Sequence, residues 1–583
     1  MTQNTQSPYD AMPWLAHYDD VVPHEFDFVP QNICTLLDEA AAEAPDNTAI
    51  IYHDYRLTYG ELHRQAEIMA ANLVEHGLQP GDRVALMMPN VPQLIPSFWA
   101  VLKAGGVVVM TNPLYMEAEL LHLMTDAKVK VLISIPACWP KLNALRFRLG
   151  VEKFFIACDS DIEVPSSRSW LSNLFGKKKE PVAGGIDFDN HQVFPYNSLL
   201  KGSKQFSAEY GDPETSLALL QYTGGTTGTP KGVMLSHANQ TSNVAQSLHM
   251  LHVLKNGPQV FAALLPIFHV YGLSTCLLIP TAVKAACVTI PRYDPGEFLS
   301  LVEKHKITAF PGAPSVYLSL LQHKDFTKYD LSSLAFGISG SAPIPAESLE
   351  KFQSISNCKL VEGYGLSESS PITHLTPAVG KQKFGSIGLP LPGTRARIVD
   401  MDVGTIEEPV GELGELIISG PQVMSGYYNR PDETAGALRN GWLYTGDIAY
   451  MDEEGYFFIV DRKKDMAIVG GFNVYPREID EVLLSHPDIK EAVSVAVAHP
   501  TRGEMVKAFV VPKEGKEPTV SEIVGYCRKH LANYKVPRQI DFRETLPRAA
   551  TGKILRRLLR DEETAKFAAE QAAQENAQNT PDA

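Results

Sequence analysis

The chain has 583 residues, which is too long for one ordinary domain and enough for a large and a small one. Its 52 basic and 67 acidic side chains leave a net charge of −15, which argues against a nucleic-acid partner. Seven scattered cysteines without a CxxC or zinc-type spacing, and a start that lacks the order of a signal peptide, indicate a cytoplasmic protein with reduced thiols.

The first part of the chain alternates the patterns of helices and strands. Residues 1–30 are polar and interrupted by proline, so we expect an extended lead-in. Thr-Tyr-Gly-Glu at 58–61 has the form of a capping box and predicts the start of a helix. Apolar runs at 84–88 and 107–110 predict strands on either side of a helix at 91–104. This alternation indicates an α/β fold with a parallel sheet covered by helices.

Residues 160–203 interrupt the alternation. They contain an aromatic and aliphatic run at 170–175 and three lysines at 177–179. This combination is typical of contact with an anionic membrane surface. It is also typical of a solvated insertion with a few packed side chains. We expect the insertion and keep peripheral contact with the inner face of the cell membrane as the alternative.

A loop rich in glycine and threonine at 222–233 is the most distinctive stretch of the chain. It follows a short apolar strand at 217–220, and the residues from Met234 onward have the pattern of a helix start. Backbone N–H groups of such a loop approach phosphate oxygens closely, while its hydroxyls and Lys231 add donors and charge. It is not a Walker A loop, because Gly232 follows the lysine where Ser or Thr is needed.

The stretch between Lys255 and Lys284 has no charged residue and is long enough to span a bilayer. Several prolines and His269 interrupt it. Its first part, residues 260–265, has the pattern of a buried parallel strand, and residues 272–279 have that of a core helix. We therefore expect it inside the fold, where it is also a candidate wall for an acyl chain.

Short strands and turns replace the alternation from about residue 391. Five charged residues at 461–465 form a bridge. Beyond the bridge the pattern predicts a helix, two strands and a helix, at 476–485, 493–498, 506–511 and 520–531. These elements indicate a small α+β domain. Residues 561–583 are rich in Ala, Gln, Glu and Asn, so we expect them to be disordered or loosely helical.

Seven motifs along the chain resemble, in order, those of the adenylate-forming superfamily, which comprises acyl-CoA synthetases, luciferase-like enzymes and peptide-synthetase adenylation domains. The motifs begin at Tyr222, Gly340, Gly363, Tyr444, Asp461, Gly470 and Thr551. Trp-Leu-Tyr-Thr-Gly-Asp at 442–447 with Asp-Arg-Lys-Lys-Asp at 461–465 resembles bacterial long-chain fatty acid–CoA ligases most. The resemblance implies a large N-terminal domain of helix-covered sheets with a small β-barrel-like subdomain at 31–460. It further implies a hinge at 461–465, a small mobile C-terminal domain at 466–560 and a polar tail at 561–583.

The resemblance also implies a reaction. The carboxylate of a long-chain fatty acid attacks the α-phosphorus of ATP with Mg²⁺ present, and the acyl-AMP then passes its acyl group to coenzyme A. A ligase for medium-chain or aryl acids and an acyl-AMP ligase that loads a carrier protein remain open. A non-catalytic, membrane-associated lipid- and nucleotide-binding protein is the alternative from another class. Some long-chain relatives have a gating tryptophan where Leu273 stands, so the chain-length preference rests on overall resemblance. A homodimer also remains open.

Residue-by-residue matching to the superfamily implies the nucleotide site. The residues that it assigns to the phosphates are Thr223, Gly224, Gly225, Thr226, Thr227, Gly228 and Lys231. It assigns Mg²⁺ to Glu368, beside Ser367, with Thr223 as a second ligand. It assigns the adenine and the acyl group to Gly340, Ser341, Ala342, Pro343, Gly363, Tyr364 and Gly365. It assigns the ribose to Asp447 and Arg462.

The same matching implies the catalytic residues. Lys553, an ammonium on a flexible stem, would reach the carboxylate and the α-phosphate as charge builds up. His269 would lie near the substrate carboxylate, and Lys464 would be the pivot about which the small domain turns between the two steps. The residues that the turn would bring beside the CoA thiol are Gly470 and Gly471. We expect Arg556 and Arg557 to be solvated surface residues.

Overall fold

The computed structural model describes residues 7–158, 161, 186–189, 191–202, 206–223, 230–469, 472–499, 503–549 and 552–578. Several predictions fall outside these residues. They concern the membrane contact at 170–179, the loop residues Gly224, Gly225, Thr226, Thr227 and Gly228, and the glycines Gly470 and Gly471.

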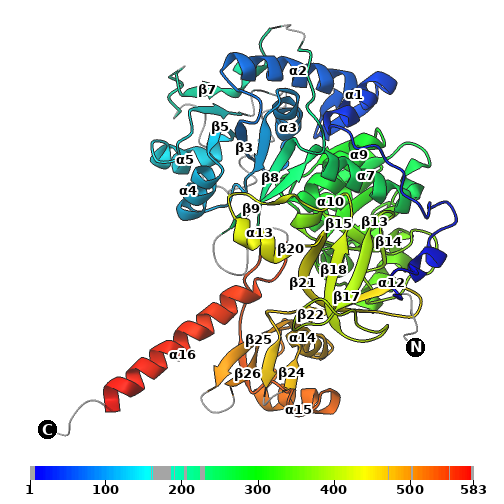
Figure 1. Cartoon of the computed structure of the whole chain (residues 1–583), viewed down its shortest axis with the longest axis vertical. Helices are drawn as coiled ribbons and strands as arrows, with labels where there is room; N and C mark the ends of the chain where they lie inside the picture. Colours follow the sequence, from blue (N-terminus) through cyan, green and yellow to red (C-terminus); the bar gives the residue numbers. More distant parts are fainter. Residues whose placement is uncertain are drawn as a thin grey trace.

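Two large sheets form most of the molecule (Figure 1). Across the first sheet the strands run β19 (Gly426–Tyr427), β9 (Lys231–Ser236), β8 (Leu217–Thr223), β4 (Val107–Met110), β3 (Arg83–Met87), β5 (Val129–Ser134), β6 (Lys153–Ile156) and β7 (Val193–Pro195). Across the second they run β16 (Leu389–Pro390), β15 (Ile372–Leu375), β14 (Lys359–Gly365), β13 (Phe336–Ser339), β12 (Ala309–Gly312), β10 (Val260–Ala263), β11 (Ala286–Thr289), β1 (Thr48–Tyr52) and β2 (Tyr55–Thr58). Neighbours β4, β3, β5, β6 and β7 are parallel, which confirms the α/β prediction.

Helices accompany these sheets. In chain order they are α1 (Cys34–Glu43), α2 (Tyr59–Glu75), α3 (Leu94–Lys103), α4 (Glu117–Asp126), α5 (Trp139–Leu145), α7 (His237–Met250), α10 (Pro295–His305), α11 (Pro314–Gln322), α12 (Ala346–Ser356) and α13 (Pro431–Ala437). The predicted capping box is present, because Thr58 accepts from the Glu61 backbone and the Glu61 carboxylate accepts from Thr58. It satisfies two donors at the start of α2.

The glycine-rich loop joins two strands, so the prediction of a strand-to-helix loop was wrong. β8 and β9 pair antiparallel, with Tyr222 opposite Gly232 and Thr223 opposite Lys231. The helix α7 begins only at His237, after the strand β9 ends. A Cβ at Gly232 would lie 3.1 Å from the Tyr222 ring, which is why glycine suits this position. The loop is therefore framed by two strand ends and not by a helix N-terminus.

The uncharged stretch lies in the core, as predicted. β10 is followed by α8 (Val270–Leu273), a π-helical turn (Ser274–Leu278) and α9 (Ile279–Ala282), and this helical run is buried apart from its last residue. Over the described ranges, no helix combines the length and the apolar character that crossing a bilayer requires. Pro258 and Pro266 lie in the connections on either side of β10, whereas Pro280 lies within the helical run at the start of α9.

The described part of the lead-in is packed and partly helical. Pro13–His17 forms a 3₁₀ helix, and the Trp14 side chain is buried. Tyr18 donates a hydrogen bond to the Pro390 carbonyl at 2.6 Å, and Tyr9 donates one to the Glu408 carbonyl at 2.8 Å. The lead-in thus fastens onto segments that follow it by several hundred residues.

A third sheet lies between the large sheets and the C-terminal part (Figure 1). Its strands are β17 (Arg395–Val399), β18 (Gly414–Ser419), β21 (Trp442–Met451), β20 (Leu438–Arg439) and β22 (Phe457–Arg462). The C-terminal sheet consists of β24 (Phe472–Val474), β23 (Ala467–Val469), β26 (Gly503–Pro512), β25 (Ile489–His499) and β27 (Gln539–Phe542), with α14 (Pro476–Leu484) and α15 (Val520–His530). It has hydrophobic clusters of its own, separate from the large core.

The last helix, α16 (Arg556–Gln578), extends away from the sheets (Figure 1). The polar tail was expected to be either disordered or helical, and residues 561–578 are helical. An ion pair anchors its second turn to the C-terminal sheet, because Lys507 Nζ lies 2.8 Å from Glu563 Oε2 with both side chains buried.

Candidate active site

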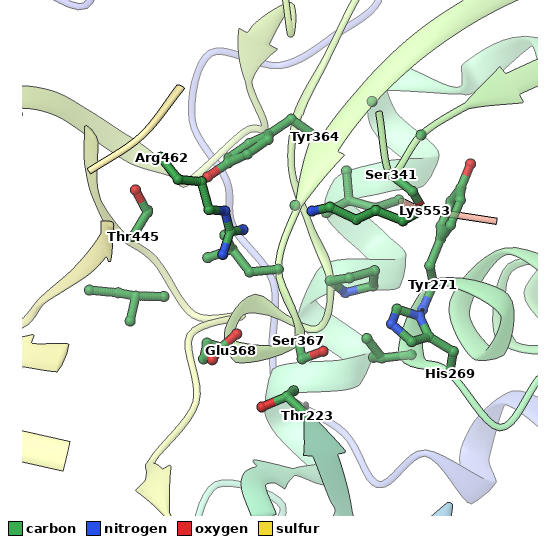
Figure 2. A pocket seen from close by; sticks show the side chains of 18 of the residues that line it. Thr223, His269, Tyr271, Ser341, Tyr364, Ser367, Glu368, Thr445, Arg462 and Lys553 are labelled. Carbon is green, nitrogen blue, oxygen red and sulfur yellow. Dashed lines mark hydrogen bonds between the residues drawn. The ribbon is translucent and has the colours of Figure 1, made fainter. Parts of the chain in front are cut away.

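A cavity of about 370 Å³ opens where the ends of β8 and β9 in the first sheet meet the second sheet, the third sheet and the C-terminal part (Figure 2). The predicted residues that line it are Thr223, Lys231, His269, Gly340, Ser341, Gly363, Tyr364, Gly365, Ser367, Glu368, Arg462, Lys464 and Lys553. They come from segments more than three hundred residues apart in the sequence. Ala342 and Pro343 follow Ser341 but do not line the cavity.

Close packing explains the glycine at one edge of this cavity. Gly340 directly follows β13, and a Cβ there would lie 2.9 Å from the Tyr271 ring. The Tyr271 hydroxyl in turn donates to the Ile338 carbonyl at 3.1 Å. The tyrosine ring and the β13 backbone therefore lie too close for any side chain at position 340.

One side of the cavity combines a lysine, a tyrosine and a glutamate. Tyr427 donates a hydrogen bond to Glu368 Oε1 at 2.8 Å, and Lys231 Nζ lies 4.9 Å from the centre of the Tyr427 ring. The tyrosine thus contacts both the cation and the carboxylate, which come from β9 and from the turn after β14. Tyr427 was not among the predicted residues, since a tyrosine after glycine in a turn-rich region carries no distinctive sequence signal.

Opposite them, an aspartate is held by two donors. Asp447 is buried, and its carboxylate accepts from the Tyr364 hydroxyl at 2.5 Å and from Arg462 Nε at 2.8 Å. Asp447 itself does not line the cavity. Tyr364 and Arg462 do line the cavity, so Asp447 acts on the site by holding these two side chains. Its carboxylate also balances the charge of the guanidinium.

His269 is a neutral imidazole in this environment. Burial, and then the charge of Lys553, lowers its pKa to about 4. Its Nδ1 accepts from the Tyr271 backbone N–H at 3.2 Å, so the ring proton is on Nε2. A neutral ring with a fixed Nε2–H can donate one hydrogen bond to an oxygen in the cavity.

Lys553 enters the cavity from the C-terminal part. Figure 2 shows its ammonium pointing toward the side formed by Tyr364 and Arg462. The positive charge of Arg462, followed by burial, lowers its pKa to about 8. Burial and the same guanidinium lower the pKa of Lys464 to about 8 as well. Two lysines beside one arginine give this end of the cavity a strong positive potential, suited to anionic oxygens.

Arg556 is not a solvated residue, which corrects the prediction. Its guanidinium lies 3.2 Å from Asp461 Oδ1 and 2.5 Å from Asp480 Oδ2. Its neighbour Arg557 faces Asp561 across one helix turn at 3.8 Å, with both side chains partly exposed. No local pattern could show that the first arginine of the helix lies between two carboxylates, because those partners are 76 and 95 residues away.

The site also fits Mg²⁺ held together with a polyphosphate. No group of three or more His, Cys, Asp and Glu side chains that could hold a metal occurs within the described ranges. The cavity instead offers the Glu368 carboxylate and the Thr223 hydroxyl. Mg²⁺ is commonly bound by one or two carboxylates plus substrate phosphates, so this donor set suits it.

Family models and known proteins agree with this geometry. The model of the AMP-binding enzyme matches residues 37–428, and that of the AMP-binding enzyme C-terminal domain matches residues 478–553. The chain belongs to the AMP-binding enzyme family. It is 45% identical over 555 residues to a long-chain-fatty-acid–CoA ligase of Bacillus subtilis, covering 95% of this chain and 98% of that protein. Identity to a long-chain-fatty-acid–CoA ligase of Escherichia coli O6:H1 is 37% over 565 residues, covering 95% and 98%.

A solved structure supports the fold. The crystal structure of ATP-bound MatB from Rhodopseudomonas palustris superposes with a TM-score of 0.79 and 29% identity, covering 91% of this chain and 99% of that one. The resemblance inferred from the seven motifs is thereby confirmed, and so is the α/β architecture with a large N-terminal and a small C-terminal part.

Proposed function

We propose that this protein is a long-chain fatty acid–CoA ligase. It converts a fatty acid and ATP into acyl-AMP and pyrophosphate, and then transfers the acyl group to coenzyme A, releasing AMP. The observation that supports this most is the single cavity that brings Lys231, Glu368, Tyr364, Arg462 and Lys553 together from distant segments. The near-complete coverage of long-chain ligases by this chain supports the substrate class.

In the first step the nucleotide would lie across the cavity. Lys231 and the Thr223 hydroxyl bind phosphate oxygens at the mouth of the glycine-rich loop, and the face of Tyr364 contacts the adenine. Arg462 donates to the ribose hydroxyls, and Asp447 would accept from them only in exchange for its present donors Tyr364 or Arg462, because it does not line the cavity. Mg²⁺, held by Glu368 together with phosphate oxygens, would neutralise charge on the departing pyrophosphate.

Two cationic or polar groups act on the attacking carboxylate. His269 donates its Nε2–H to a carboxylate oxygen and orients it. The Lys553 ammonium stabilises negative charge that develops between this carboxylate and the α-phosphate. Such fixed donors contribute more in a cavity than in water, because they need no reorganisation during the reaction.

The second step requires the C-terminal part to move. We propose that it turns about residues 461–465, with Lys464 as the pivot, so that Lys553 leaves the cavity and CoA gains access. The thiolate of CoA then attacks the acyl carbonyl, and AMP leaves with the electron pair of the mixed anhydride bond. Gly470 and Gly471 would line the route of the thiol, although they lie outside the described residues.

The test is a CoA-thioester assay across saturated acids of graded chain length, with ATP, Mg²⁺ and CoA. The expected result is AMP release that depends on CoA and is fastest with long chains such as palmitate. Fastest turnover with short or aryl acids would contradict the substrate class. Acyl-AMP that accumulates in the presence of CoA would indicate a ligase that loads a carrier protein.

Membrane contact and self-association are separate parts of the proposal. The aromatic run and lysines at 170–179 support peripheral contact with an anionic bilayer. Sedimentation with anionic vesicles, compared between the wild type and a variant with Lys177, Lys178 and Lys179 changed to Ala, tests this. Equal binding of both proteins would contradict it. Light scattering tests whether the protein forms a homodimer.

A further inference from the structure

A buried network of charges joins the base of α16 to the end of β22, where the proposed hinge begins. Arg556 Nη1 lies 3.2 Å from Asp461 Oδ1, and Arg556 Nη2 lies 2.5 Å from Asp480 Oδ2. The Asp461 side chain is 2% exposed and that of Arg556 is 20% exposed. A largely buried guanidinium between two carboxylates is a strong contact only while both partners are in place.

Asp461 holds a second element of the C-terminal part. Its Oδ2 accepts a hydrogen bond from the Arg477 backbone N–H at 2.8 Å. This N–H is in the first turn of α14, where backbone donors have no acceptor within the helix. Arg477 also donates through Nη1 to the Ile459 carbonyl at 2.7 Å. The end of β22 is therefore bound both to α14 and to α16.

The same network fixes the position of Lys553. This lysine lies three residues before Arg556, and its neighbourhood is held by hydrogen bonds from Ala549 N to Lys553 O at 2.8 Å and from Leu555 N to Pro547 O at 2.8 Å. The pair of Arg556 with Asp461 therefore holds the backbone that carries Lys553 close to β22.

The contacts of Arg556 differ in their relation to the proposed hinge at 461–465. Asp480 lies beyond the hinge, as Arg556 does, so a rigid turn of the C-terminal part leaves that pair intact. Asp461 lies at the end of β22, on the other side of the pivot. A turn separates it from both Arg556 and the start of α14.

We propose that Asp461, with Arg556 and Arg477, forms a lock that holds the C-terminal part in the orientation for acyl-adenylate formation and opens before acyl transfer to CoA. All three are positioning residues for Lys553 and touch no substrate. The inference rests on the proposed two-step function. The lock lowers the free energy of the orientation for acyl-adenylate formation relative to the other one, which a hinge alone does not do.

Electrostatics makes this lock reversible. Burial raises the pKa of Asp461 and raises that of Asp480 to about 7, so both carboxylates are costly to keep charged without Arg556. When the C-terminal part turns, Asp461 loses its partners but gains water at the opened interface. Hydration then offsets part of the lost ion pair, whereas Asp480 keeps its arginine throughout.

The decisive experiment measures the two half-reactions separately in Asp461→Asn, which keeps the shape of the side chain and removes its charge. ATP–pyrophosphate exchange with palmitate reports the first step, and thioester formation from supplied palmitoyl-AMP and CoA reports the second. We expect exchange to fall about tenfold or more, and thioester formation to change less than about twofold or to rise. A tenfold fall corresponds to about 1.4 kcal/mol between the orientations.

Two further variants serve as comparisons. Asp480→Asn removes the partner that stays with Arg556 in both orientations, so we expect equal effects on the two half-reactions. Asp541→Asn removes an ion pair with Lys507, at 3.0 Å, that lies within the C-terminal sheet, and we expect neither half-reaction to change. An equal loss of both half-reactions in Asp461→Asn, or no change in either, would overturn the lock.

A readout other than activity follows from the same idea. Opening the lock exposes Arg462, Lys463 and Lys464, so trypsin should cleave Asp461→Asn there faster than it cleaves the wild type, with the cut mapped by mass spectrometry. If this variant does not fold, Arg477→Gln removes the contact to Ile459 and should show the same split to a smaller degree. A wild type that forms no acyl-CoA contradicts the proposed function, whereas an active wild type without the split contradicts only the lock.

Discussion

Raising the pH should slow acyl-adenylate formation by removing one proton, that of Lys553. The charge of Arg462, followed by burial, lowers the pKa of this lysine to about 8. A group with that pKa is about 90% protonated at pH 7 and about 10% protonated at pH 9. Because only the ammonium can stabilise the developing negative charge, the first half-reaction should fall about tenfold over this interval.

The assay is ATP–pyrophosphate exchange with palmitate at saturating Mg²⁺-ATP between pH 6.5 and 9.5. The matched variant is Lys553→Arg, whose guanidinium stays charged throughout, so its lower exchange rate should show no decline near pH 8. His269 cannot produce the decline, because its pKa is lowered to about 4. Lys464 has a pKa of about 8 too, so Lys464→Ala serves as the control and should keep the decline.

The pH dependence of exchange in the two variants shows which lysine is the titrating group. A decline of the same midpoint and depth in Lys553→Arg would refute the assignment, because the lysine would then not be the titrating group. A decline that disappears in Lys464→Ala and persists in Lys553→Arg would transfer the role to the other lysine.

Three further outcomes are expected. Glu368→Gln should raise the Mg²⁺ concentration for half-maximal exchange about tenfold or more, and calorimetric titration of Mg²⁺-ATP should weaken in parallel; an unchanged Mg²⁺ dependence would remove Glu368 from the metal site. Lys464→Pro fixes φ at the proposed pivot, so thioester formation from palmitoyl-AMP should fall at least about tenfold while exchange stays within about twofold; unaffected thioester formation would place the pivot elsewhere. Lys103→Met removes a buried ammonium paired with Asp38 at 2.5 Å, and denaturant unfolding followed by tryptophan fluorescence should show a loss of about 2 kcal/mol; equal stability would mean that packing replaces the pair.

The sequence predicted helices and strands correctly where a few neighbouring residues specify them. The capping box at Thr58 and the apolar runs at 84–88 and 107–110 specify a helix start and two strands within a few residues, and the structure confirms them. The helix entry expected within residues 234–239 is confirmed, because Ser236 caps α7 and the helix begins at His237. The strand β9 before it was missed, because it is specified by pairing with β8 and not by a local pattern.

The site divides in the same way. The resemblance to the superfamily pointed to many of the residues that line the cavity, because its motifs can be matched residue by residue. Ala342, Pro343 and Asp447, which it also assigned, do not line the cavity. Tyr427 and Arg556 were missed or misjudged. Neither side chain has a distinctive local sequence pattern. Tyr427 is positioned by its hydrogen bond to Glu368, and Arg556 by its ion pair with Asp480.

The sequence by itself determined the family and the residue types of the chemistry, because these depend on short motifs, and it determined those elements whose pattern is local. Only the tertiary structure decided that Lys553 lies in the same cavity as Thr223 and that Arg556 is buried against Asp461. Contacts between residues hundreds of positions apart are set by how sheets and helices pack. Burial and charge pairing there depend on three-dimensional neighbours, which no local pattern records.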